Sequence, residues 1–262
     1  MTSLNSDIIS AHLRTKSIGR SLEFFPEIDS TNSYAKQHLN THGAVVLADY
    51  QFAGRGRQGR SWVSPKGQSI LMSVVLKPEK GHPSLQIITL AAAVVIIDVL
   101  KGTLGIRAQV KWPNDILIHG KKVCGILTES ALQGDQMHKI IIGIGCNVYQ
   151  TSNQFPGYLK YPVTSLSLET ETPVDRHLII AEILNQLEIM YDSLIAGERA
   201  AIIDRWRQHC FHLGKPVRVI QGENVVVGNC MNINEEGALI VEDARGKIIP
   251  VSSGEIHLEQ FV

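Results

Sequence analysis

The apolar pattern of the chain changes near Gly214, and this change restricts the possible folds more than any other feature. Before this point, helix-type and strand-type periodicities alternate. After it, residues 217–258 contain only short β-type runs divided by Gly, Asn and Asp, which is typical of a small β-barrel. We therefore expect a large domain of alternating helices and strands over residues 1–212, followed by a small all-β domain over residues 213–262.

Local spacing predicts the main elements of the large domain. Strands are expected over residues 44–50, 69–76, 109–111 and 139–145, with a hairpin over 116–128. Helices are expected over residues 33–39, 84–100 and 200–210, and after Asp175 as far as Leu194. The apolar run at 87–100 is short for a membrane span and contains Asp98, which favours a buried helix.

Charge and cysteine usage exclude several classes of protein. Lys plus Arg and Asp plus Glu both number 25, so no overall field would hold the chain on nucleic acid or on an anionic membrane. The first twenty residues lack the pattern of a secretory leader. The four cysteines form no CxxC pair and lie far apart in sequence, which indicates reduced thiols in a cytoplasmic protein rather than a disulfide framework or a zinc site. We assign them no chemistry.

The densest chemical signal is the segment 51–62, QFAGRGRQGRSW. Its glycines allow a ligand to approach the backbone, and its three arginines supply positive forks for phosphate or carboxylate oxygens, so we predict an anion-binding loop. Gly54, Gly56 and Gly59 also satisfy GxGxxG, but arginines fill the variable positions and Pro65 follows where a Rossmann helix would begin. An RNA-binding RG segment is also disfavoured, because such segments suit disordered tails and this one lies between two apolar strands.

A second polar group is Lys111-Trp112-Pro113-Asn114-Asp115. A tight turn alone would explain the Pro-Asn-Asp sequence. A lysine, an amide and a carboxylate at a rigid turn would also suit phosphates bound with Mg²⁺, which prefers one or two carboxylates together with phosphate oxygens. This segment alone leaves both interpretations open.

Two further segments are ambiguous when taken singly. Lys121 and Lys122 lie at a predicted hairpin tip, where solvated charge is usual, and Gly125 indicates close backbone approach. Gly143 and Gly145 alternate after an apolar strand, which indicates either a bulge or space for a flat ring against the backbone.

Taken together and in order, these segments resemble the biotin protein ligase family over nearly the whole chain. The resemblance rests on Ser30-Thr31-Asn32, Gly54–Trp62, Lys111–Asp115, Lys122–Gly125 and Gly143–Asn147, and GRGRxGRxW with KWPND is its most specific part. It implies an α+β fold, with a large catalytic domain in which helices flank a mixed β-sheet and a small SH3-like C-terminal β-barrel. It also implies an ATP-dependent ligase that converts biotin to biotinyl-5′-AMP and transfers biotin to a lysine of a biotin carboxyl carrier domain, such as that of acetyl-CoA carboxylase. The alternative is a lipoate ligase or octanoyl transferase of the same superfamily.

The resemblance also assigns roles to individual positions. Biotin contacts fall to Ser30, Thr31, Asn32, Gln51, Arg55, Gly56, Arg57, Lys122 and Gly125. ATP or adenylate contacts fall to Gly54, Arg57, Arg60, Trp62, Lys111, Asn114 and Asn147. Lys111 is the expected catalytic lysine, assisted by Arg55 and Arg57, and Asp115 is the expected Mg²⁺ contact.

The resemblance implies a homodimer in the cytoplasm. Family members that also act as repressors carry an N-terminal winged-helix domain, whereas only about twenty-five residues precede Pro26 here. That length is too short for a DNA-binding domain with its own core. We expect the short, monofunctional type, with neither nucleic acid nor a membrane as a partner.

Overall fold

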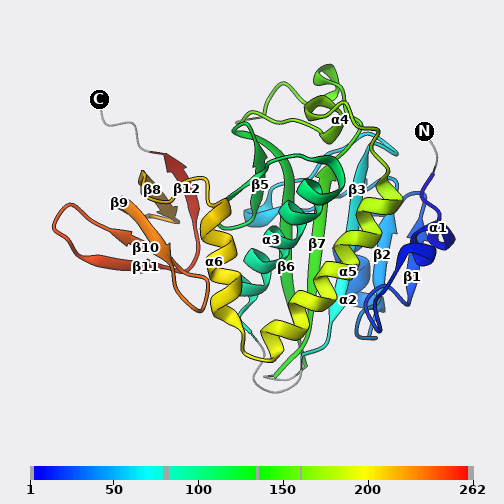
Figure 1. The fold of residues 1–262 in the computed structure, drawn as a ribbon, viewed down its shortest axis with the longest axis horizontal. Helices are drawn as coiled ribbons and strands as arrows, with labels where there is room; N and C mark the ends of the chain where they lie inside the picture. The colour runs from blue at the N-terminus through cyan, green and yellow to red at the C-terminus, as the bar shows by residue number, and fades with distance from the viewer. Residues whose placement is uncertain (1–2, 79–82, 134–135, 160, 259–262) are drawn as a thin grey trace.

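The computed structural model describes residues 3–78, 83–133, 136–159 and 161–258. Its largest element is a seven-stranded sheet (Figure 1), whose strands in spatial order are β1 (Leu22–Phe25), β2 (Val45–Ala48), β3 (Ser69–Leu76), β7 (Gln136–Asn147), β6 (Lys121–Gln133), β5 (Asp115–Ile118) and β4 (Gln109–Lys111). β1 and β2 are parallel, and the other neighbouring pairs are antiparallel. The predicted mixed sheet is confirmed.

Helices bury both faces of this sheet. In Figure 1, α3 (Leu85–Leu104), α5 (Arg176–Ile195) and α6 (Arg199–His209) lie on the face of the sheet towards the viewer, and α2 (Thr31–His38) lies on the opposite face. In β2, Val45 and Leu47 join the core under α3 and α5, whereas Val46 packs with Ala35 of α2. Because successive side chains of a strand point to opposite faces, two cores explain the uninterrupted apolar run of β2.

The central helix α3 is buried, as predicted, but it is longer than predicted. Ser84 caps it by accepting a hydrogen bond from the Ile87 N–H, and the helix continues past Leu100 to Gly105, whose left-handed φ of 69° ends it. With 20 residues it is long and apolar enough to cross a membrane, judged by length and composition alone. However, 78% of its apolar 18-residue stretch is buried inside the fold. It packs against α5, α6 and β6, so it is a core helix.

The sequence did not predict α1 (Ser6–His12). One carboxylate holds the segment after this helix against α5. Glu188 accepts hydrogen bonds from the backbone N–H groups of Lys16, Ser17 and Ile18 at 2.6–2.9 Å. Burial alone would raise the pKa of Glu188, but these bonds favour its charged form and lower the pKa to about 2.

Replacing Glu188 with Gln should therefore remove a pH-dependent part of the stability. A depressed pKa adds stability above the unfolded-state value of about 4.3, and that stability is lost as the pH falls towards about 2. We expect Glu188→Gln to lower the free energy of unfolding at pH 7 by about 1–3 kcal/mol. Thermal melts from pH 7 to pH 2 should show a shallower decline in the variant than in the wild type. The exposed Glu171→Gln is the control, and equal pH profiles for wild type and Glu188→Gln would contradict the assignment.

The C-terminal part is an antiparallel sheet of five strands, in the spatial order β11 (Ile248–Val251), β10 (Leu239–Glu242), β9 (Asn224–Ile233), β8 (Pro216–Gln221) and β12 (Glu255–Leu258). In β8, buried Val217 and Val219 flank exposed Arg218, which is the alternation expected of a half-buried strand. This confirms the predicted small β domain, which lies beside α6 in Figure 1.

The β domain shares its core with the large sheet. Trp112 is fully buried, and its indole N–H donates to the Gly237 carbonyl at 3.2 Å. The Ser84 hydroxyl donates to the Glu236 carbonyl at 2.7 Å. Apolar residues of both parts, including Val217, belong to one buried cluster. The exact division at residues 212 and 213 stays a prediction.

The cysteines are not isolated in the fold, although they lie far apart in sequence. Cys124 and Cys146 are opposite each other on β6 and β7. Cys210 and Cys230 meet beside His212 where the two parts join. Separation in sequence therefore did not indicate separation in space, because the fold brings these residues together in two pairs.

Candidate active site

A cavity of about 720 Å³ gathers nearly all of the predicted site residues. Its walls come from the start of α2, the loop between β2 and β3, strands β5, β6 and β7, residues 155–159 and 161–163, and β12. Of the predicted residues, those that line it are Ser30, Thr31, Asn32, Gln51, Arg55, Gly56, Arg57, Arg60, Trp62, Asn114, Asp115, Lys122, Gly125 and Asn147. Gly54 and Lys111 do not line it.

The start of α2 forms a buried polar wall of this cavity. Ser30 caps the helix, and both the backbone N–H and the hydroxyl of Thr31 donate to Gln51 Oε1, at 2.7 and 3.0 Å. The Ser73 hydroxyl lies 2.6 Å from Asn32 Oδ1. The cap residue Ser30 and the helix residues Thr31 and Asn32 are each less than 5% exposed. Their hydrogen bonds fix the side chains in place before any ligand arrives.

The arginine-rich loop folds as a closed hairpin. The Trp62 N–H donates to the Gly54 carbonyl at 2.9 Å, and the Gly56 N–H donates to the Arg60 carbonyl at 2.6 Å. A Cβ at Gly54 would lie 2.4 Å from the Trp62 carbonyl oxygen, so this position requires glycine. Residues 61–68, all of which the structure describes, contain no helix. The segment is therefore not a Rossmann phosphate turn, an interpretation that its arginines and Pro65 already disfavoured.

Four cations face the cavity, and each lies near a polar partner. The pairs are Arg55 with Glu129 at 3.0 Å, Arg57 with Asn114 at 3.4 Å, Arg60 with Glu255 at 3.4 Å, and Lys122 with Asp115 at 2.7 Å. Burial lowers the pKa of Arg57, and the nearby Asp115 carboxylate opposes this effect. A guanidinium still stays charged at neutral pH, so the cavity wall presents preorganised positive charge to an anionic ligand.

Glycines on β6 and β7 make room for the indole of Trp62. A Cβ at Gly145 would lie 2.6 Å from the Trp62 ring, and one at Gly125 would lie 3.0 Å from it. The two glycines are opposite each other in the sheet. The Trp62 indole nitrogen is buried and has no hydrogen-bond partner among the described residues. Its N–H can therefore donate to a bound ligand.

Asn147 lines the cavity, but its amide is already engaged. Its side-chain nitrogen donates to the Thr164 carbonyl at 3.0 Å, and its Oδ1 accepts from Gln150 at 3.1 Å. With a 5% exposed side chain, Asn147 supports the wall rather than extending into the cavity.

Lys111 lies in a second cavity of about 270 Å³. Its ammonium nitrogen is 4.2 Å from the centroid of the Tyr161 ring, and Tyr161 lines both cavities. Burial lowers the pKa of Lys111, while the carboxylates of Asp115 and Glu255 raise it. The predicted catalytic lysine therefore lies beside the large cavity and contacts the tyrosine between the two.

The residues at or next to the cavity that were not predicted include four polar ones that make contacts there: Ser73, Glu129, Tyr161 and Glu255. Glu129 accepts from the Asn32 amide at 2.9 Å while it pairs with Arg55. The Tyr161 hydroxyl donates to Glu255 at 2.9 Å. A polar residue inside the apolar run of β3 was a usable signal for Ser73. Glu255 has no such signal, because the fold alone brings β12 to the cavity.

Comparison with known proteins identifies the class. The Biotin/lipoate A/B protein ligase family matches residues 24–147, and the Biotin protein ligase C terminal domain matches residues 212–258. The chain is 36% identical to the bifunctional ligase/repressor BirA of Bacillus spizizenii, over 97% of this chain and 79% of that protein. It is 33% identical to a biotin–acetyl-CoA-carboxylase ligase of Paracoccus denitrificans, over 86% of this chain and 95% of that protein.

A solved structure gives the same result. The biotin protein ligase of Aquifex aeolicus, in complex with biotin and ATP, superposes with a TM-score of 0.81 at 29% identity and covers 92% of this chain and 100% of that chain. Fold and site thus define a protein of the biotin and lipoate ligase class. Within that class, the chain belongs to the biotin protein ligase family. The predicted family and its ATP-dependent ligase activity are confirmed.

Proposed function

We propose that the large cavity binds biotin and ATP together, forms biotinyl-5′-AMP, and passes biotin to a lysine of a biotin carboxyl carrier domain. The observation that carries this proposal is the single cavity in which buried polar groups, three arginines and a lysine converge. The Aquifex aeolicus relative was solved with biotin and ATP, which supports the same pair of ligands here.

The buried polar wall suits the ureido head of biotin. A ureido group offers two N–H donors and one carbonyl acceptor, and so needs both kinds of partner in a fixed arrangement. Ser30, Thr31 and Asn32 supply hydroxyl and amide groups held by Gln51 and Ser73. Such a wall disfavours the plain acyl chain of octanoate, which would leave these polar groups unpaired.

The cations suit the anionic end of the reaction. One oxygen of the biotin carboxylate attacks the α-phosphorus of ATP, the bond from that phosphorus to the bridging oxygen breaks, and pyrophosphate leaves. We assign Arg55, Arg57 and Lys122 to the carboxylate and phosphate oxygens, where their charge offsets repulsion between two anions. The amine of the acceptor lysine then attacks the acyl carbon and AMP leaves.

The donor set also fits a magnesium ion that enters with the ATP phosphates. Mg²⁺ is usually held by one or two carboxylates and by phosphate oxygens, and the carboxylates of Asp115 and Glu255 both line the cavity. Asp115 would hold the ion, which would neutralise charge on the departing pyrophosphate.

Labelled pyrophosphate exchange into ATP tests the proposed function directly. We expect exchange that depends on biotin, with lipoate and octanoate as inactive alternatives. Exchange supported by lipoate alone would move the chain to the lipoate branch of the class, and silence with every acid would refute adenylation.

Gly143 offers a test of where biotin binds. A Cβ at Gly143 would lie 2.1 Å from Asn32 Oδ1. We expect Gly143→Ala to displace Asn32 and to weaken biotin binding by about 10–100-fold, since forced overpacking costs about 1–3 kcal/mol. Isothermal titration with biotin measures the change. Gly102→Ala on α3, where an added Cβ meets no atom within 4 Å, is the control. Unchanged biotin affinity would place the ligand elsewhere.

The arginine-rich loop should become protected when the adenylate is bound, because a mixed anhydride exposed to water would hydrolyse. We expect slower hydrogen exchange over residues 54–61 with biotinyl-5′-AMP than without it. Equal exchange in the two states would contradict a closing role. The β10–β11 hairpin, none of whose residues lines the cavity, serves as the internal reference.

The partner and location follow from the same family. We propose a carrier domain of a biotin-dependent carboxylase as the acceptor, action in the cytoplasm, a homodimeric assembly and no nucleic-acid partner. The relative named for acetyl-CoA carboxylase supports the acceptor. Sedimentation velocity with and without biotinyl-5′-AMP tests the assembly.

A further inference from the structure

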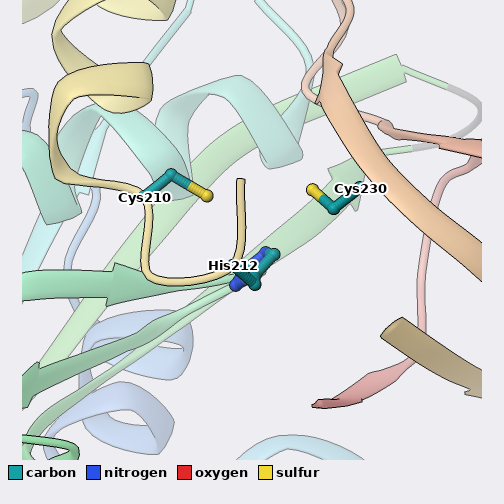
Figure 2. Close-up of side chains that lie close together, drawn as sticks. All are labelled: Cys210, His212 and Cys230. Atoms are coloured by element: carbon teal, nitrogen blue, oxygen red, sulfur yellow. The ribbon is translucent and has the colours of Figure 1, made fainter. Parts of the chain in front are cut away.

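Three side chains with metal-binding atoms meet where α6 joins the β domain. Cys210 follows the end of α6, His212 lies two residues further on, and Cys230 is on β9. Their ligand atoms all lie within 4.8 Å of one another. Figure 2 shows the sulfurs of Cys210 and Cys230 pointing towards each other, with the ring of His212 beside them.

The backbone holds these residues together. Cys210 bridges to Val110 at the edge of the large sheet. The Gly214 N–H donates to the Cys230 carbonyl at 2.8 Å, and the Cys230 N–H donates to the Lys215 carbonyl at 2.9 Å. The turn around His212 is thus fastened to β9 by main-chain hydrogen bonds. Substituting one of the three side chains would leave this main-chain connection intact.

The His212 ring is buried without a hydrogen-bond partner. It is 1% exposed, and neither ring nitrogen has a partner among the described residues. The edge of Trp206 lies against it, with ring centroids 6.2 Å apart. A buried imidazole that makes no hydrogen bond is unfavourable, because it has lost the hydrogen bonds that water would supply. A metal ion accepting the lone pair of one nitrogen would relieve much of this cost.

We propose that Cys210, His212 and Cys230 bind a zinc ion, with water in the fourth position. Two thiolates and one imidazole are soft and borderline donors that suit zinc and do not suit magnesium. In a tetrahedral zinc site the ligand atoms lie about 3.3–3.8 Å apart, so side-chain rotations that draw the three atoms closer by up to about 1 Å complete the geometry. The ion connects the end of α6 to β9 and fixes the β domain on the catalytic domain.

Cobalt substitution tests this site without reference to ligase activity. Wild-type protein, purified with a reductant and stripped with a chelator, should bind cobalt and show the charge-transfer band of thiolate ligands and the intense visible bands of a tetrahedral site. Protein purified without chelator should contain close to one zinc ion per chain by mass spectrometry. Chelation should lower the melting temperature of the wild type.

The variants separate this site from other thiols. Removing a residue that only hydrogen-bonds to a metal ligand typically lowers metal affinity roughly 10–100-fold. Cys230→Ala and His212→Ala each remove a ligand itself, so they should lower cobalt affinity at least as much. Cys146→Ala, which removes another buried cysteine, should bind cobalt as the wild type does. Wild-type protein without a thiolate–cobalt band, an unchanged band in Cys230→Ala, or a Cys210–Cys230 disulfide in place of bound metal would overturn the proposal. The wild-type spectrum decides even if a variant fails to fold.

Discussion

Lys111→Ala is expected to slow biotin-dependent pyrophosphate exchange by roughly 10²–10³-fold, the usual loss when one group directed at developing charge is removed. Biotin affinity should change little, because Lys111 does not line the large cavity. Its ammonium lies against the Tyr161 ring, which borders both cavities. We expect the Lys111 ammonium to leave the Tyr161 ring and bind ATP phosphates when they reach this border, because a phosphate attracts an ammonium group more strongly than an aromatic face does.

Exchange assays and biotin titrations on the same preparation distinguish these two effects. Lys101→Ala, an exposed lysine in the last turn of α3, is the control and should behave as the wild type. Near-normal exchange by Lys111→Ala would remove Lys111 from the mechanism. A loss of biotin affinity as large as the loss of exchange would make it a ground-state binding residue instead.

Arg176→Met is expected to destabilise the fold by about 3–5 kcal/mol, because it leaves a buried carboxylate without its cation. The Arg176 guanidinium donates to Asp49 at 3.1 Å and to the Ser69 carbonyl at 3.0 Å, and its side chain is 2% exposed. This contact joins the start of α5 to the two ends of the segment that carries the arginine-rich loop. Biotin affinity should therefore fall together with stability.

Urea unfolding followed by circular dichroism measures this loss. Arg14→Met breaks the pair with Glu182, in which the arginine side chain is 65% exposed, and should cost no more than about 1 kcal/mol. The double variant Arg176→Met with Asp49→Leu should be more stable than Arg176→Met alone, because it removes the uncompensated charge. Equal midpoints for Arg176→Met and Arg14→Met would show that the buried pair is not a main tether.

Helix starts and buried strands were predictable because their causes are local. Ser30, Ser84 and Asp175 accept capping hydrogen bonds from their own helices, and β3 spans the predicted residues Ser69–Leu76. Boundaries set by pairing were not predictable. β6 continues to residue 133 and β7 begins at residue 136 because the two strands hydrogen-bond to each other over this length. β1 is half-exposed, and its apolar pattern is too weak to predict a strand.

The site was predictable where motifs carry it and unpredictable where only the fold does. The loop at 51–62 and the turn at 111–115 stand out by composition. Tyr161 and Glu255 are single polar residues whose role depends on the position of the segment before α4 (Leu166–Glu169) and of β12. The resemblance to the family supplied the role of Lys111, but not its position behind Tyr161.

The cavity wall includes an ion pair between Arg60 and Glu255, residues 195 positions apart in the chain. Contacts over such separations form late, because the chain must lose the entropy of closing a long loop before the contact can stabilise the fold. During synthesis, the large sheet can form while the last strands are still absent, yet the cavity lacks one wall until β12 pairs with β8. A nascent chain would thus have most of its core before it has a complete binding site, so the catalytic cleft matures at the end of folding.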